Sequence, residues 1–184
     1  MGVTEGMAGT KQARRALDAA RSAVDAAATI HEALREIGRA LHDDFPGIVR
    51  ASLRVLEPEG ETMRLVEVWS EQPTTIEAGI IVRTSATSFP ELQRKPKALI
   101  RSMAHTDMPL DDVLRREGIW SWVSIPVRER GKPCAMLSLS SDDPNEFEVG
   151  DSAFFTALGA AVEGRLITLV QTGDTSSRIH KKTD

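Results

Sequence analysis

The stretch Gly118–Ser141, which reads GIWSWVSIPVRERGKPCAMLSLSS, decides the fold of this chain. Two runs rich in β-branched, aromatic and other apolar residues, Ile119–Val127 and Cys134–Ser140, flank the short polar connection Arg128–Pro133. Runs of this kind joined by a few turn residues pair directly as an antiparallel hairpin. The first run is apolar on both faces, whereas the second has one more polar face. We therefore expect the inner hairpin of a sheet that helices cover on at least one side.

Composition and charge exclude several classes of protein. The chain has 184 residues, of which 41% are hydrophobic and 27% are charged, and this length predicts one domain with an appended helix or tail. A net charge of −4 gives no electrostatic reason to expect nucleic-acid binding. No apolar run approaches the ~20 residues that cross a bilayer. The single cysteine excludes an internal disulfide and a multi-cysteine zinc site. We expect a cytoplasmic protein with neither a nucleic-acid nor a membrane partner.

The first quarter of the chain has the pattern of one long helix. Apolar residues recur at alternating three- and four-residue steps from Ala13 to Leu41, as in a helix–helix interface. A helix of ~30 residues would be ~45 Å long, beyond the diameter of a small domain. Its second half, Ile30–Leu41, carries branched aliphatic residues and is expected against the domain body. The alanine-rich first half is then expected to project or to pair with a second chain, which predicts a homodimer. The alternative is one amphipathic helix that lies on its own domain.

The other elements follow from local patterns. We expect strands at Ile48–Glu57, Met63–Ser70, Ile80–Val82 and Ala98–Met103, short helices near Pro90–Lys95 and from Pro109 to Arg116, and a closing helix at Asp151–Val170. The closing helix carries an apolar stripe at helical spacing: Phe155, Leu158, Val162, Leu166 and Leu169. The domain limits that result are a disordered segment at 1–9, a dimerisation helix at 10–44, a folded domain at 45–171 and a disordered tail at 172–184.

This order of elements resembles the GAF domain over about residues 30–170. GIWSWVSIPV is similar to the family's Gly-x-x-Ser strand that ends in apolar-Pro-apolar, and PCAMLSLSS to its following strand. FEVGDSAFFTAL, with Phe147 and Asp151, is similar to the family's Phe-x-x-x-Asp start of the last helix, and PKALIRSM occupies the place of its middle strand. One departure is Pro133-Cys134, where many members carry an apolar residue followed by Gly.

The resemblance implies an α+β fold with α/β/α-type layers. Its sheet would have about six antiparallel strands, with the N- and C-terminal helices packed on one face and a small-molecule pocket under loops on the other. It also implies a sensory or regulatory role in signal transduction and dimerisation through the terminal helices. The chain would then pass its signal to a separate partner protein, unless it is a fragment of a larger regulator.

Several functional branches of the family require residues that this chain lacks. Cyclic-nucleotide binders carry an Asn-Lys pair and a Glu where Ser152 stands, so Phe147 and Asp151 are interpreted as a core residue and a helix-start acid. Bilin binders attach the pigment to a Cys usually followed by His, but Ala135 follows Cys134. Free methionine sulfoxide reductases use a second, resolving cysteine. We expect Cys134 to be a buried structural residue on the strand face of Met136 and Ser138.

The leading hypothesis is a non-enzymatic sensor without cofactor or metal. The alternatives are a sulfoxide reductase-like enzyme using Cys134, and a pure dimerisation module with a closed pocket. If a ligand binds, we expect a small anionic metabolite held by Arg101, because an arginine within a strand can bind a carboxylate or phosphate. His105 and one of the two tryptophans, Trp120 or Trp122, would lie beside it. Alternatively, Arg101 pairs internally with Asp107 or Glu117, and side chains fill the pocket.

Overall fold

The structure, a computed structural model, describes residues 11–105 and 111–180 of the chain. Six strands form one sheet in the order β3-β2-β1-β6-β5-β4, and every neighbouring pair is antiparallel. The strands are β1 (Ile48–Leu56), β2 (Thr62–Ser70), β3 (Ile81–Arg83), β4 (Leu99–Ser102), β5 (Ser121–Glu129) and β6 (Lys132–Ser141). The predicted α+β fold with a six-stranded antiparallel sheet is therefore confirmed. The disorder expected at 1–9 lies outside the described residues.

The predicted central hairpin is formed by β5 and β6. Its turn is shorter than the expected Arg128–Pro133 connection, because the strands continue to Glu129 and restart at Lys132. The two residues between them, Arg130 and Gly131, have φ values of 51° and 80°. Positive φ at both positions is typical of the two-residue turn whose twist matches that of the flanking strands.

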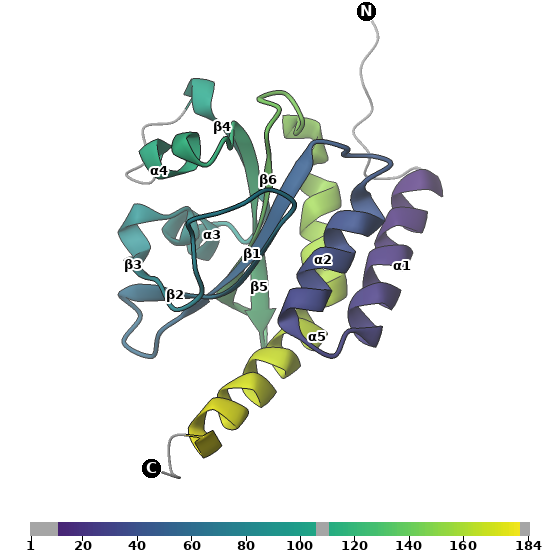
Figure 1. The fold of residues 1–184 in the computed structure, drawn as a ribbon. Coiled ribbons are helices and arrows are strands. Elements are labelled where there is room, and N and C mark those ends of the chain that lie inside the picture. The colour runs from purple at the N-terminus through teal and green to yellow at the C-terminus, as the bar shows by residue number, and fades with distance from the viewer. Residues whose placement is uncertain (1–10, 106–110, 181–184) are drawn as a thin grey trace, which may run out of the picture.

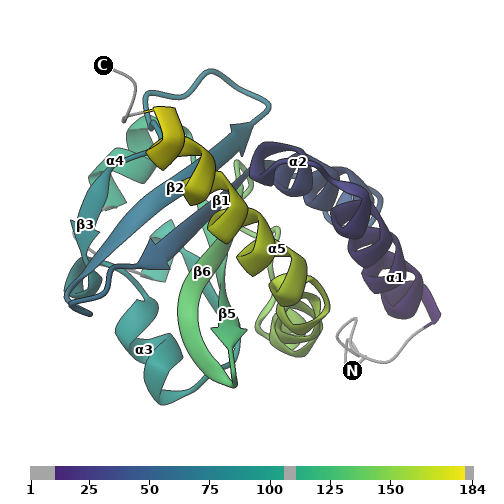
Figure 2. The same ribbon diagram turned by 90° about the horizontal axis from the view of Figure 1, so that it is seen from below.

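Helices α2 (Ile30–Leu41) and α5 (Ser152–His180) cover one face of the sheet, and α1 (Lys11–Ala26) packs on α2 and α5, as Figures 1 and 2 show. Apolar side chains of α2 and α5 pack against the inward-facing residues of the central strands. The buried residues of this core include Leu34, Ile37, Leu41, Leu53, Ile125, Leu137, Leu139, Phe155, Leu158, Val162 and Leu166. The stripe predicted on the last helix is therefore confirmed as core.

The prediction of one long N-terminal helix is wrong. The chain turns between α1 and α2, so that α1 lies alongside α2 and α5 (Figure 1). The Thr29 hydroxyl accepts a hydrogen bond from the Glu32 amide at 3.1 Å, and the Glu32 carboxylate accepts one from the Ala28 amide at 2.9 Å. Side-chain caps of this kind satisfy the free N–H groups at a helix start. Within residues 11–41, therefore, no single helix reaches ~45 Å, because α1 ends at Ala26 and α2 begins at Ile30.

The heptad seam of the N-terminal region is buried within the chain itself. Ala13, Ala16 and Ala20 of α1 belong to the same core cluster as Leu34 of α2. Small alanine side chains let two helix backbones approach closely. The homodimer stays a prediction, and a dimer would have to use the outer faces of these helices rather than the seam.

Helix α5 extends beyond its predicted end at Val170. It continues to His180, so residues 172–180 are helical rather than part of a disordered tail. By length and composition alone, the segment Val149–Gly173 could cross a membrane, since an 18-residue window within it has a mean hydropathy of 1.5. Its apolar residues Phe155, Leu158 and Val162 are buried against the sheet, which accounts for this hydropathy in a core helix.

The start of α5 confirms the structural interpretation of two motif residues. Phe147 is buried in a cluster of aromatic rings, with its ring centroid 5.5 Å from that of Phe155. The Asp151 carboxylate accepts a hydrogen bond from the Glu148 amide at 3.0 Å, which caps the turn that leads into the helix. On the opposite face of the sheet lie the short helices α3 (Phe89–Arg94) and α4 (Asp111–Arg116), together with the β2–β3 loop (Figure 1).

Candidate ligand cavity

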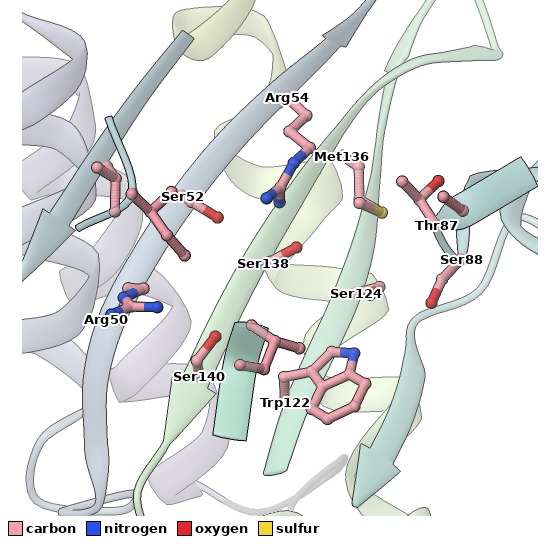
Figure 3. Close-up of a pocket in the computed structure, with 14 residues that line it drawn as sticks. Arg50, Ser52, Arg54, Thr87, Ser88, Trp122, Ser124, Met136, Ser138 and Ser140 are labelled. Carbon is pink, nitrogen blue, oxygen red and sulfur yellow. The ribbon is translucent and has the colours of Figure 1, made fainter. Parts of the chain in front are cut away.

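The sheet face opposite the long helices carries an ordered set of polar side chains. In the strand register, Arg50 of β1 pairs with Ser140 of β6, which pairs with Trp122 of β5. The next row on the same face is formed by Ser52, Ser138 and Ser124. Directly paired residues of antiparallel strands point to the same side of the sheet. Figure 3 shows the resulting floor, with Arg54 and Met136 beyond the serine row.

A cavity of about 60 Å³ lies over this floor. Its cover comes from segments that are distant in sequence. Ile76 belongs to the β2–β3 loop, Thr87 and Ser88 precede α3, and Leu114 belongs to α4. The cavity therefore combines two arginines and several hydroxyl groups with an apolar wall that includes Trp122 and Met136.

Arg50 is a buried cation with unused hydrogen-bond donors. Its side chain is only 4% exposed, and its Nη2 donates to Glu117 Oε2 at 2.7 Å and to Thr74 Oγ1 at 3.1 Å. Its Nε and Nη1 are buried and have no hydrogen-bond partner among the described residues. Leaving buried donors unsatisfied is costly, and such groups in folded proteins often mark a site for water, an ion or a ligand.

Glu117 neutralises Arg50 and ties two segments together. Its carboxylate also accepts hydrogen bonds from the Thr74 hydroxyl at 2.6 Å, the Thr75 amide at 3.1 Å and the Thr75 hydroxyl. Burial raises the pKa of Glu117, but the hydrogen bonds from Thr74, Thr75 and Arg50 outweigh it and lower the pKa to about 2. The carboxylate is therefore ionised at neutral pH. Its hydrogen bonds join Glu117, the residue after α4, to the β2–β3 loop.

Arg54 has no counter-charge in the described part of the chain. No hydrogen bond or ion pair joins its guanidinium group to a described residue. Burial lowers the pKa of Arg54, and the charge of Arg50 lowers it further. A guanidinium group nevertheless stays protonated in proteins. In Figure 3 its side chain points along the floor toward Ser52 and Ser138. Two neighbouring arginines, of which Arg50 is paired with a carboxylate and Arg54 is not paired with a described one, form a site that can hold an anion.

Of the three sequence-predicted site residues whose side chains the structure describes, one lies at this cavity. Trp122 lines it and is buried, whereas Trp120 is 40% exposed and does not line it. Arg101 faces the same side of the sheet as its register partner Trp122, but it forms an ion pair with Glu91 of α3 outside the cavity. For His105, only the backbone is described, in a short 3₁₀ turn.

One expected internal partner of Arg101 was wrong, because Glu117 pairs with Arg50 instead. The other, Asp107, lies outside the described residues. The alternation along Ile48–Glu57 predicts a half-buried strand, but it does not show whether Arg50 and Arg54 face solvent or a cavity. The available signal was two arginines at alternating positions of a strand.

Cys134 lies on the other side of the sheet from the predicted face. Val127 of β5 pairs with Ala135 and Arg128 pairs with Pro133, which leaves Cys134 as the extra residue of a β-bulge. Such an extra residue interrupts the alternation of side chains along a strand. Cys134 packs against the core cluster under the long helices, and its thiol donates to the Val127 carbonyl at 3.6 Å. It therefore does not line the cavity.

The half-buried Cys134 thiol is expected to be poorly reactive. Burial, and then the charge of Glu129, raise the pKa of Cys134, so little thiolate is present at neutral pH. Labelling of the native protein with a thiol reagent is expected to be much slower than labelling in urea. Cys134→Ala is expected to lower the free energy of unfolding by about 1 kcal/mol, because a small partly buried group is lost. Equal labelling rates with and without urea would contradict this prediction.

A metal centre finds no support in the described part of the chain, where no three His, Cys, Asp or Glu side chains gather. Comparison with characterised protein sequences yields no significant match. The sequence profile of the GAF domain, in contrast, matches residues 10–166.

Solved structures with the same fold include both regulatory domains and an enzyme. The GAF domain of an Acinetobacter phosphoenolpyruvate-protein phosphotransferase superposes with a TM-score of 0.66 at 13% identity, covering 90% of this chain and 99% of that one. The free methionine-R-sulfoxide reductase of Neisseria meningitidis has a TM-score of 0.64 at 16% identity, covering 94% and 99%. The GAF domain of a Bacillus halodurans sensor histidine kinase has a TM-score of 0.56 at 19% identity, covering 76% and 97%. At these identities the likeness shows the fold alone, but with the profile match it establishes that the chain belongs to the GAF domain family.

Proposed function

We propose that this protein is a non-enzymatic sensory GAF domain that binds a small anion at Arg50 and Arg54. The observation that supports it most is Arg54, a half-buried cation beside a second arginine with no carboxylate partner among the described residues. A like-charged pair of this kind is unfavourable unless an anion neutralises it. We also propose that the protein is cytoplasmic, forms a homodimer and passes its signal to a separate partner protein.

The site would act as a sensor because the segments that cover the cavity and the strands that form its floor are distant in sequence. The β2–β3 loop and the end of α4 meet at Glu117, which contacts Arg50 on the floor. An anion that binds Arg50 would change the hydrogen bonds that hold these segments together. A partner protein that contacts the loop or α4 could then distinguish the free and bound states.

The enzymatic alternative is a reductase for free methionine sulfoxide. The sequence has one cysteine, and Cys134 lies across the sheet from the cavity. A substrate bound over the polar floor would therefore not reach the thiol. Incubation with free methionine sulfoxide and a thiol reductant is expected to yield no methionine above the rate without protein. Turnover that disappears in Cys134→Ala would replace the sensor proposal.

Removing the Arg54 charge is expected to weaken anion binding. We expect isothermal titration with a panel of small carboxylates and oxyanions to find at least one that binds the wild type. Arg54→Gln is expected to weaken that binding by at least about tenfold, because it removes the cation that lacks a protein partner. The experiment also separates the sensor from the pure dimerisation module with a closed pocket, which would bind no anion.

Arg128→Gln is the matched control for Arg54→Gln. Arg128 is also a partly buried arginine of the sheet, but its Nε donates to Glu163 of α5 at 3.2 Å, away from the cavity. It is expected to bind the anion as the wild type does. Equal affinities of Arg54→Gln and wild type, or equal losses in the two variants, would contradict the proposed site.

A further inference from the structure

We propose that the cavity selects a short-chain monocarboxylate, because Arg50, Glu117 and Arg54 together leave it one unbalanced positive charge. This inference rests on the proposed function and adds the charge and size of the ligand. Three observations carry it: the charges around the cavity, its volume, and the arrangement of donors and apolar walls.

The net charge of the site follows from three described side chains, those of Arg50, Arg54 and Glu117. Among the described residues that line the cavity, the charged side chains are Arg50 and Arg54. The one described carboxylate that bonds to either of them belongs to Glu117, and its side chain is 6% exposed. It is ionised at neutral pH, since its pKa is about 2. Asp111, the buried acid at the start of α4, does not line the cavity. Two cations and one anion leave a net charge of +1.

A monoanion balances this charge, whereas a dianion does not. A buried charge without a counter-charge costs several kcal/mol or shifts its protonation state. A carboxylate carries one negative charge at neutral pH, but sulfate and most phosphate groups carry nearly two. A dianion would leave an excess negative charge in contact with the Glu117 carboxylate. The site therefore favours a carboxylate over a divalent oxyanion.

The volume limits the ligand to a few atoms. The cavity holds about 60 Å³, whereas an apolar cavity of about 150 Å³ accommodates benzene, with its six carbons. In proportion, the cavity has room for about two to three non-hydrogen atoms. This is close to the size of formate and acetate. A nucleotide or a tetrapyrrole would require the cover to move away.

The donors suit a carboxylate with a short tail. Nε and Nη1 of Arg50 each have a hydrogen to donate, and the Arg54 guanidinium lies across the serine row from them. A carboxylate can accept about four hydrogen bonds through its two oxygens. Leu114, Trp122 and Met136 line the same space and would contact a methyl group. The arrangement thus places cations and hydroxyls at one part of the ligand and apolar surface at another.

The test changes the net charge of the site by substitution and measures which anion binds more tightly. Wild type, Glu117→Gln and the control Glu163→Gln are titrated calorimetrically with acetate and with sulfate at constant ionic strength. The wild type is expected to bind acetate at least about tenfold more tightly than sulfate. Glu117→Gln raises the site's net charge to +2 and is expected to lower this ratio by at least about tenfold. Glu163→Gln removes the carboxylate partner of Arg128 outside the cavity and is expected to keep the wild-type ratio.

A second variant covers the case in which Glu117→Gln does not fold. Arg54→Gln brings the net charge to zero and is expected to favour neutral acetamide over acetate, the reverse of the wild-type preference. Pentanoate is expected to bind the wild type at least about tenfold more weakly than acetate, because its chain exceeds the cavity.

The inference is overturned if the wild type binds sulfate or pentanoate as tightly as acetate, or if neither Glu117→Gln nor Arg54→Gln changes the preference. If the folded wild type binds none of these anions, the proposed function fails with it.

Discussion

Replacing Leu34 with Asp is expected to unfold the domain rather than to dissociate a dimer. Leu34 lies on α2 and is fully buried, and it shares one core cluster with residues of α1, α5 and the sheet. The substitution removes a large apolar side chain and places a charge where no partner is available. Together these changes are expected to cost at least about 4 kcal/mol, close to the whole stability of a small domain.

Circular dichroism and light scattering distinguish the two outcomes for Leu34→Asp. The structure predicts loss of the cooperative unfolding transition at room temperature. Ser22→Asp is the control, because it introduces the same charge at an exposed position of α1 and is expected to change stability by less than about 0.5 kcal/mol. A folded Leu34→Asp monomer obtained from a wild-type dimer would show instead that Leu34 lies at an interface between chains.

The Glu117 carboxylate is expected to make the stability of the domain strongly dependent on acidic pH. Its pKa falls from the ordinary 4.5 to about 2 in the folded state, despite burial, because Thr74, Thr75 and Arg50 donate hydrogen bonds to it. A group with a depressed pKa in the folded state stabilises it above the unfolded-state pKa. That stabilisation is lost as the pH falls toward the folded-state pKa. The shift corresponds to about 3 kcal/mol at neutral pH.

Urea denaturation of wild type and Glu117→Gln at two pH values measures this contribution. Glutamine has the same shape but does not ionise, so the variant lacks the pH-dependent contribution of Glu117 to the free energy of unfolding. The difference in unfolding free energy between the two proteins is expected to shrink by about 2 kcal/mol from about pH 7 to about pH 3, where the unfolded-state carboxyl is already protonated. Glu163→Gln, with a carboxylate that is more exposed, is the control. A difference that is the same at both pH values would show that Glu117 has an ordinary pKa.

Local sequence patterns were sufficient for the parts of the fold that depend on neighbours in the chain. The runs on either side of Arg130 and Gly131 pair directly, and the stripe from Phe155 to Leu169 has only one way to be buried on a helix. The turn at Thr29 also has a local signal, since Thr29 and Glu32 have the spacing of a helix cap. The heptad pattern nevertheless favours a continuous helix, because Ala27–Thr29 contains neither Pro nor Gly.

Tertiary contacts determined the reversal of α1, the side of the sheet on which Cys134 lies, and the cavity. An alanine seam can be buried by another chain or by the same one, and only the packing of α1 on α2 and α5 selects the second. The strand period would place Cys134 with Met136, but the register against β5 introduces a bulge there. A strand pattern shows that Arg50 and Arg54 share a face, yet it cannot show whether solvent covers that face. The β2–β3 loop and α4 bury it, and their contacts join residues that lie 24 to 67 positions apart in the chain.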